Sequence, residues 1–345
     1  MSKGMGFTRT AKTWASPISG HAHWKRRRES FTWPGTTSRQ EAVDMSTPLS
    51  RNRSRFLNAI ALFVILIPSL AAVAAPEQRG LVYAVRSDQV TLYVAGSIHV
   101  LREDDYPLPA VLNEAYEKSD ALIMELDLDD LDPLESAALI RSLAMAPGGS
   151  SLRSLMGDAS FNRSRESALA LGLDLERFAA VRPWFAALMV LDWSLRQAGY
   201  SPEIGVEQYF LRLAVTDKKP VEGLETVEQQ LNIFASLSDA DQGMFLEKTL
   251  AELDQLAGEI EKLLEAWKTG DERALELLLL DSFDEYPELF DELVDQRNLA
   301  WERQLTEILR HGKQDYMVIV GALHLLGEHG VIELLRKRGF KIQRL

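Results

Sequence analysis

Two segments of the chain carry the same pattern, an apolar run followed by Gly-x-x-His. Residues 92–101 read LYVAGSIHVL and residues 317–326 read MVIVGALHLL, which places His99 and His324 at matching positions. Two imidazoles that meet in a protein interior need a partner, and a divalent metal is a suitable one. A single Gly-x-x-His is typical of an ordinary loop, but the matched pair predicts a shared metal or catalytic site.

Other polar residues could complete such a site. Glu125 closes the apolar run Ala121–Leu126, and a lone carboxylate there is costly to bury unless it is paired or bound to a metal. Glu225 follows a strand-like run, where it is either a ligand or general base, or the N-terminal carboxylate of a helix. Arg297 and Asn298 could orient a substrate carbonyl or a ligand, or form a surface ion pair.

The remaining two histidines of the segment after residue 75 have simpler interpretations. His311 precedes Gly312 at the end of a helical pattern and is typical of a helix C-terminal cation. His329 lies in the run Gly-Glu-His-Gly, which indicates a turn, with a supporting role at the site as the alternative.

The elements after the two motifs also match. The first motif is followed by a helical pattern at 109–118 and a strand at 121–126, and the second by a helix at 331–338 and a strand at 340–345. A strand–helix–strand unit makes its two strands parallel, and ligands bind beyond the carboxyl ends of such strands. We therefore expect an α/β fold in which two related strand–helix–strand halves share a central, mostly parallel sheet.

A long helical insertion, about residues 133–310, separates the two halves. It contains a helix at Pro183–Gln197 and a short strand at Lys219–Gly223. A long helix then begins after Ser238 and ends at Gly270, with leucines and Trp267 spaced three and four residues apart. This stripe indicates helix packing rather than a cofactor site.

Composition excludes several classes of protein. The 345 residues contain no cysteine, which rules out disulfides, thiolate zinc sites and a cysteine nucleophile. The 51 acidic residues against 38 basic ones argue against a nucleic-acid partner. Charge is unevenly distributed: residues 1–75 hold 11 basic and 3 acidic residues, so the remainder holds 27 basic and 48 acidic ones.

The basic N-terminal part is typical of an export signal. From Met45 to Ala75 a basic stretch precedes the apolar run 56–70 and a series of small residues, the pattern of a secretory signal peptide cleaved after Ala75. The apolar run is shorter than the ~20 residues of a membrane helix, so we expect no membrane span after cleavage and a periplasmic or extracellular protein; an uncleaved anchor is the alternative. Residues 1–44 are interpreted as an upstream extension from a start codon assigned too early, with a basic binding patch at Lys25–Arg28 as the alternative.

The chain resembles the TraB/GumN family, which is related to the TIKI metalloproteases. The resemblance runs in order over nearly all of residues 81–345 and rests on these stretches: GSIHVL (96–101), YPLP (106–109), AYEKSDALIMELD (115–127), RPWFAALM (182–189), GVEQYF (205–210), KPVEGLET (219–226), RNLAWERQL (297–305) and VIVGALHLLGEHGV (318–331).

The resemblance implies a single domain at 76–345, with a fold similar to ChaN-like and erythromycin-esterase-like proteins, and a divalent metal held by His99, Glu125 and His324. Glu225, Arg297 and Asn298 also fall on motif positions. Glu207 departs from the pattern, because relatives often have aspartate there. For the TIKI branch the resemblance implies metal-dependent peptide hydrolysis.

These observations lead to three hypotheses. The first is an exported, metal-dependent hydrolase, peptidase-like, which uses Mn²⁺, Co²⁺ or Zn²⁺ on a peptide or small-molecule substrate. In it Glu225 takes a proton from water, and Arg297 or Asn298 stabilises the oxyanion. The second is a non-catalytic binding protein that sequesters a peptide or a haem-like ligand. The third is a helical interaction module with an inert site.

Overall fold

The computed structural model describes residues 79–127, 132–280 and 287–345. All of them lie in the compact unit Leu70–Leu345. The signal peptide expected at 45–75 and the extension expected at 1–44 lie outside the described residues, so both stay predictions.

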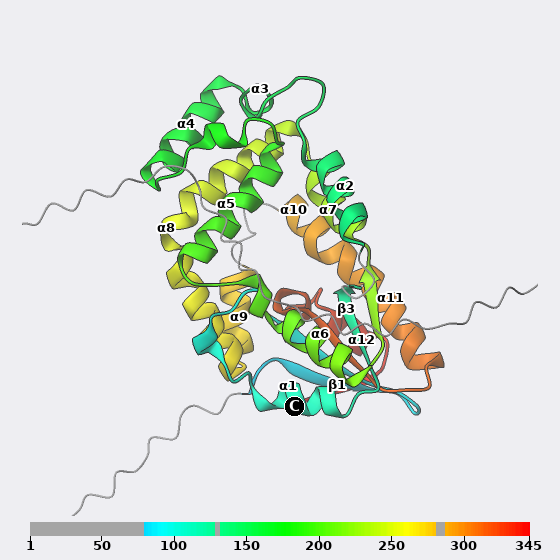
Figure 1. Cartoon of the computed structure of the whole chain (residues 1–345). Helices are drawn as coiled ribbons and strands as arrows, with labels where there is room; N and C mark the ends of the chain where they lie inside the picture. The colour runs from blue at the N-terminus through cyan, green and yellow to red at the C-terminus, as the bar shows by residue number, and fades with distance from the viewer. Residues whose placement is uncertain (1–78, 128–131, 281–286) are drawn as a thin grey trace, which may run out of the picture. The chain divides into compact units, whose positions relative to one another are not determined.

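The described residues contain a six-stranded sheet, which lies in the lower half of the view in Figure 1. The strands lie in the order β4-β3-β5-β2-β1-β6, and β4, β3, β5 and β2 are mutually parallel. Only β1 runs antiparallel to its neighbours β2 and β6. The predicted α/β fold with a mostly parallel sheet is therefore confirmed. The strands are β1 Val82–Arg86, β2 Thr91–Ser97, β3 Ala121–Leu126, β4 Val221–Glu225, β5 Tyr316–Gly321 and β6 Lys341–Arg344.

The two strand–helix–strand units interleave within this sheet. Helix α1 (Ala110–Glu117) connects β2 to β3, and α12 (Val331–Lys337) connects β5 to β6. Strand β5 lies between β2 and β3, so the first strand of the second unit is inserted between the strands of the first. In this register Ser97, the second residue of the first motif, pairs with Gly321, the first residue of the second, so the two motifs begin side by side with an offset of one residue.

The central strands are buried on both faces. Residues Val94, Ile123 and Ile319 are at most 1% exposed, as are most of their neighbours in these strands. Helices cover both faces of a sheet of this kind, which explains why its strands are continuous apolar runs in the sequence rather than alternating ones.

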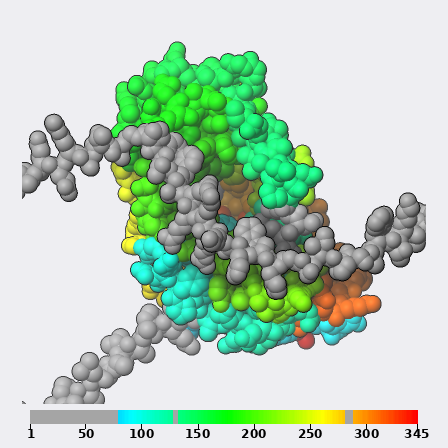
Figure 2. Space-filling model, in the orientation of Figure 1, coloured from blue at the N-terminus to red at the C-terminus, as the bar shows by residue number. Residues whose placement is uncertain are grey.

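The predicted helical insertion is present, with β4 within it. In the space-filling view its helices, in green and yellow, form much of the visible face (Figure 2). The remaining helices are α2 Pro133–Ala144, α3 Leu152–Met156, α4 Asp158–Ala170, α5 Pro183–Gln197, α6 Val206–Asp217, α7 Val227–Ala235, α8 Asp239–Thr269, α9 Glu272–Leu279, α10 Pro287–Phe290 and α11 Gln296–His311.

Helix α8 connects two separate hydrophobic cores. Its first half packs against α3, α4 and α5 through Leu246, Leu250 and Leu253, whereas Leu264 and Trp267 near its end join the core of the sheet. The Trp267 indole N–H donates to the Gly96 carbonyl at 2.7 Å, which ties the end of α8 to the first motif.

Strand β4 begins two residues later than the sequence predicted. Lys218 adopts a left-handed conformation, and the Lys219 N–H still donates to the Ala214 carbonyl at the end of α6. Pro220 has no N–H to contribute to a strand ladder. As a result, the strand starts at Val221, and Glu225 becomes its last residue.

No helix among the described residues is long and apolar enough to cross a membrane.

Candidate functional site

The polar residues singled out from the sequence gather at one edge of the sheet, where four neighbouring parallel strands end. Glu225 and Glu125 lie at the carboxyl ends of β4 and β3, while His324 and His99 follow β5 and β2. This is the edge at which open α/β sheets bind ligands. The order of the strands therefore brings together residues that are far apart in sequence.

Gly321 is the point around which three of these side chains converge. A Cβ atom built on Gly321 would lie 3.2 Å from His99 Nε2, 3.3 Å from Glu125 Oε1 and 3.6 Å from His324 Cδ2. Contacts of 3.0–3.4 Å are tighter than most real Cβ contacts, so the glycine leaves the space that the two imidazoles and the carboxylate share.

His324 is held in one orientation and one tautomer. The Asn298 side-chain amide donates to the His329 carbonyl at 2.9 Å, so its oxygen faces His324 Nδ1, 2.7 Å away. That oxygen can only accept, so Nδ1 carries the hydrogen and Nε2 presents its lone pair. Trp301 packs against the ring with centroids 4.5 Å apart. Burial lowers the pKa of His324 to about 3, so the imidazole is neutral.

His99 is held through the same ring nitrogen, but by a charged partner. Its Nδ1 lies 2.7 Å from Glu207 Oε1, and Glu207 also accepts from the Ser97 hydroxyl. The Glu207 carboxylate raises the pKa of His99 to about 9. The His99 side chain as a whole is 62% exposed, so the centre is open to solvent at His99.

Helix α6 delivers Glu207 to this position. Its N-cap, Gly205, lies so close to the first motif that a Cβ there would meet the His99 carbonyl oxygen at 2.1 Å. The Val206 N–H donates to the Ile98 carbonyl at 3.3 Å. The glycine in the GVEQYF stretch thus permits the close approach that places Glu207 beside His99.

Glu125 is buried and surrounded by donors. It accepts from the Gly321 N–H at 2.7 Å, from Gln230 at 3.0 Å and from Arg297 at 2.5 Å. Burial by itself would raise the pKa of Glu125, but His324, His99, Arg297 and the Gly321 N–H together lower it to about 2. Glu125 is therefore an anion at neutral pH.

Arg297 lies between the two buried glutamates. Its Nε donates to both oxygens of Glu225, at 3.2 and 3.1 Å, and its Nη2 donates to Glu225 at 2.6 Å and to Glu125 at 2.5 Å. Its Nη1 donates to the Leu293 carbonyl and to His324 Nε2, both at 2.9 Å. Gln230 on α7 bridges Glu125 and Glu225.

A π-helical turn at Asp291–Asp295 positions Arg297 and Asn298. It precedes α11 directly, and one extra residue per turn changes the direction in which the following side chains point. The Leu293 carbonyl within this turn accepts from Arg297 Nη1. Both residues are therefore parts of a buried network rather than of a surface ion pair.

The donor types around Gly321 suit a divalent metal, but the side chains would have to move closer together to bind one. Two imidazole rings and one carboxylate oxygen surround Gly321. Each imidazole has its Nδ1 hydrogen bonded to a protein oxygen, as metal-ligating histidines have. Among the described residues, however, no three histidine or acidic side chains are close enough together to hold an ion as they stand. His324 Nε2 and Glu125 Oε1 are 4.0 Å apart, and Arg297 donates to His324 Nε2.

The other two histidines lie outside this centre. His311 is exposed in the last turn of α11, as expected from the sequence, and its Nε2 lies 3.5 Å from Glu307 Oε2. His329 bonds through Nδ1 to Asp295 at 2.7 Å and supports the centre only through its carbonyl oxygen, which fixes Asn298.

Sequence reasoning did not assign a role to three residues that the structure places in the network. Glu207 was noted only as a departure from the family pattern, and Gln230 and Trp301 were not singled out. The signal available for Glu207 was its position two residues after Gly205. Gln230 gives no such signal, because its contacts depend on how α7 packs.

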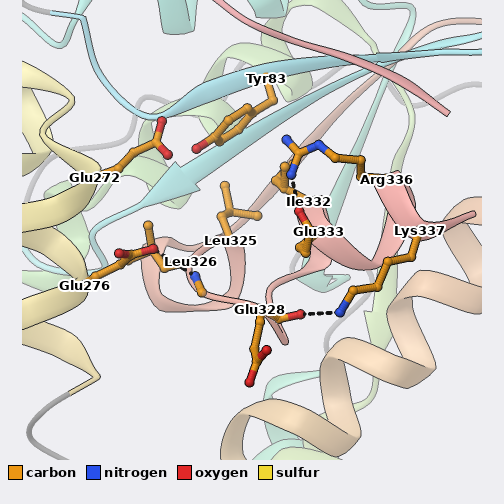
Figure 3. A pocket seen from close by; sticks show the side chains of 11 residues that line it. Tyr83, Glu272, Glu276, Leu325, Leu326, Glu328, Ile332, Glu333, Arg336 and Lys337 are labelled. Atoms are coloured by element: carbon orange, nitrogen blue, oxygen red, sulfur yellow. Dashed lines mark hydrogen bonds and ion pairs between the residues drawn. The ribbon is translucent and has the colours of Figure 1, made fainter. Parts of the chain in front are cut away.

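A separate pocket of about 440 Å³ is lined by other residues (Figure 3). Leu325 and Leu326, which follow His324, form part of its lining, together with Glu272 and Glu276 from α9 and Arg336 and Lys337 from α12. It contains none of the residues of the centre, and several of its charged side chains are already paired, as Arg336 is with Glu333.

The fold and the site define an α/β protein with an imidazole–carboxylate centre at the carboxyl edge of its parallel strands. The chain belongs to the TraB/PrgY/gumN family, whose family model matches residues 81–344. No solved structure matches the chain.

The chain is also similar in sequence to individual named proteins. The chain is 28% identical over 244 residues to the "Uncharacterized protein YbaP" of Escherichia coli strain K12, which covers 71% of this chain and 87% of that protein. It is 26% identical over 305 residues to the "Metalloprotease TIKI homolog" of Amphimedon queenslandica and 24% identical over 304 residues to the "Metalloprotease TIKI2" of Danio rerio. These matches cover 74% and 73% of this chain but only 59% and 58% of the two TIKI proteins.

Proposed function

We propose that the protein is an exported, metal-dependent hydrolase that cleaves peptide bonds, with His99, Glu125 and His324 as the metal ligands. The observation that carries the proposal is the convergence of these three groups on Gly321, with the Nδ1 atom of each imidazole bonded to a protein oxygen. The names of the two TIKI relatives as metalloproteases support the reaction class.

The proposed ligand set contains two nitrogens and one oxygen. Such a mixed set suits Mn²⁺, Co²⁺ and Zn²⁺ alike. A bound ion would polarise the scissile carbonyl and lower the pKa of a coordinated water towards ~7. The chain's own contribution is to hold neutral His324 and anionic Glu125 in position, through Asn298 and the Gly321 N–H.

The remaining residues have proposed roles in proton transfer and charge stabilisation. Glu225, 7% exposed, is the proposed proton acceptor, and Arg297 is the proposed donor to the developing oxyanion. Asn298 has both ends of its amide engaged by His324 and His329, so we assign it the orientation of His324. The proposed substrate is a peptide, which reaches the centre from the exposed side of His99.

The test uses protein that has been stripped of metal and reloaded with Mn²⁺, Co²⁺ or Zn²⁺ separately. A peptide library should be cleaved only after reloading, and a His99→Ala, His324→Ala double variant with an unchanged circular dichroism spectrum should lose turnover. Turnover that survives the double substitution would remove the histidines from the reaction. Metal or haem binding without any turnover would favour the binding-protein hypothesis instead.

A further inference from the structure

The guanidinium of Arg297 fills the space between Glu125 and His324, where a metal bound to both would have to lie. A guanidinium has five N–H donors, and all five have acceptors here: Glu225 twice, Glu125, the Leu293 carbonyl and His324 Nε2. The last of these matters most, because the Nε2 lone pair of His324 can accept one hydrogen or bind one metal, but not both.

Electrostatics explains why a cation must be present at this position. Glu125 and Glu225 are 11% and 7% exposed, and two carboxylates at such depth need a compensating charge. Arg297 supplies it from a side chain that is itself 13% exposed. In a chain without metal, the guanidinium offsets part of the negative charge of these two carboxylates.

The contacts of Arg297 fall into two groups. The Nε atom and one Nη2 hydrogen bind Glu225, and the guanidinium carbon lies 4.6 Å above the Trp301 ring; none of these contacts involves a proposed metal ligand. The bonds to Glu125 Oε2 and His324 Nε2 do involve them. The first group can therefore keep Arg297 in the site when the second group is released.

We infer that Arg297 is the built-in counter-cation of the metal-free centre and competes with the divalent metal for His324 Nε2. This inference rests on the proposed metal site. Metal loading then exchanges one cation for another, and the N–H released from His324 becomes available to a substrate oxygen. Arg297 accordingly sets the metal affinity of the centre in addition to its proposed role in the reaction.

The test compares Arg297→Met with Arg310→Met, which removes an exposed arginine from the same helix. Isothermal titration with Mn²⁺ or Zn²⁺ alone should give a dissociation constant for Arg297→Met at least roughly tenfold below that of the wild type, because one charge-assisted hydrogen bond no longer opposes binding. Arg310→Met should bind like the wild type. An equal or weaker affinity in folded Arg297→Met would overturn the inference.

Two further measurements keep the outcome interpretable. Metal-free Arg297→Met should melt at a lower temperature than the wild type, and saturating metal should raise its melting temperature more than that of the wild type. If this variant does not fold, Arg297→Lys keeps a positive charge for Glu225 with fewer donors and should also bind metal more tightly than the wild type; unchanged affinity there counts against the inference.

The result is separable from the proposed function. If Arg297→Met binds metal more tightly but the wild type cleaves no peptide, the competition between Arg297 and the metal stands and the proposed hydrolase is rejected. Metal-dependent cleavage by the wild type, together with an unchanged metal affinity in Arg297→Met, would support the hydrolase and reject the competition between Arg297 and the metal. Failure of both proteins to bind any metal would reject both proposals.

Discussion

At the scale of single residues, the centre depends on a glycine, Gly321, which has no side chain to fill the space between the polar groups. Gly321 ends β5 and leaves the space that His99, Glu125 and His324 share, while its N–H donates to Glu125. A larger residue would not disturb the buried strand itself, because the atoms that it meets are the ends of side chains. Function and folding can therefore be separated at this position.

We expect Gly321→Ala to abolish most of the proposed activity with little loss of stability. The added methyl displaces His99 Nε2 and Glu125 Oε1, and a misplacement of about 1 Å can reduce a rate roughly 100-fold, whereas the free energy of unfolding should fall by less than about 1.5 kcal/mol. Gly258→Ala on α8, where nothing lies within 4 Å, is the control. Wild-type turnover in Gly321→Ala would contradict the placement of the centre.

Glu207 illustrates a residue that acts through its neighbour. Its carboxylate raises the pKa of His99 to about 9, so the stabilisation from this pair is complete below the ordinary histidine pKa and is lost as the pH rises through about 9. Glu207→Gln keeps the acceptor oxygen and removes the charge. In the metal-free protein, the pKa of His99 measured by NMR should then move down towards its ordinary value of about 6.5; an unchanged titration would argue against the pairing.

At the scale of elements, a buried ion pair joins a short 3₁₀ turn after His99 to α8, the long helix of the insertion. Asp105 in the 3₁₀ turn Glu103–Asp105 is buried and accepts from Lys268 near the end of α8 at 2.8 Å and from the Arg102 N–H at 2.7 Å. Together with the bond from Trp267 to Gly96, this pair fixes α8 against the first motif. These contacts with α8 therefore fix the position of the loop that follows His99.

This pair makes a prediction about pH. Burial raises the pKa of Asp105, but the bonds from Lys268 and the Arg102 N–H lower it by more than burial raises it. The pKa of Asp105 therefore lies below its ordinary value. The stabilisation is present above the ordinary aspartate pKa of about 4 and is lost as the pH falls through the lower, folded value.

Asp105→Asn should therefore lower the free energy of unfolding at pH 7 by roughly 1–3 kcal/mol, the cost of breaking a buried charged hydrogen bond. It should lose less additional stability than the wild type between pH 5 and pH 2. Urea denaturation at these pH values tests this, and parallel losses in the two proteins would show that Asp105 does not contribute to acid sensitivity.

At the scale of the whole molecule, the interleaved strands explain how one site is assembled from distant parts of the chain. Strand β5 enters between β2 and β3 only after the entire insertion has been made, and it brings His324 to the edge already defined by His99 and Glu125. Non-local pairing of this kind is slow to form. The centre therefore combines residues from His99 to His324 and is not expected in either half alone.

The export prediction also belongs to this scale. When the chain is expressed from Met45 in a bacterium with a periplasm, we expect cleavage after Ala75 and a mature protein that begins at Pro76. Intact-mass measurement of the periplasmic fraction checks the cleavage point. A protein that retains residues 45–75 and sediments with membranes would instead support the uncleaved anchor.

Local sequence determined most of the elements of this protein. The bounds expected for Ala121–Leu126 and Pro183–Gln197 agree with the structure, as do the N-cap Ser238 and the terminating Gly270 of α8. Apolar periodicity, caps and glycines act over a few residues, so they can be recognised without a fold. The repeated Gly-x-x-His motif also predicted that His99 and His324 would meet.

Only the tertiary structure decided how the polar residues pair. Arg297 contacts Glu125 across 172 positions of sequence, and Glu207 reaches His99 because α6 starts against the first motif. Such contacts depend on strand order, on register and on the extra residue in the π-helical turn, none of which is encoded in local periodicity. The sequence therefore offered His99, Glu125 and His324 as candidates but not Glu207, Gln230 or Trp301. The packing of distant elements decided that an arginine lies between Glu125 and His324.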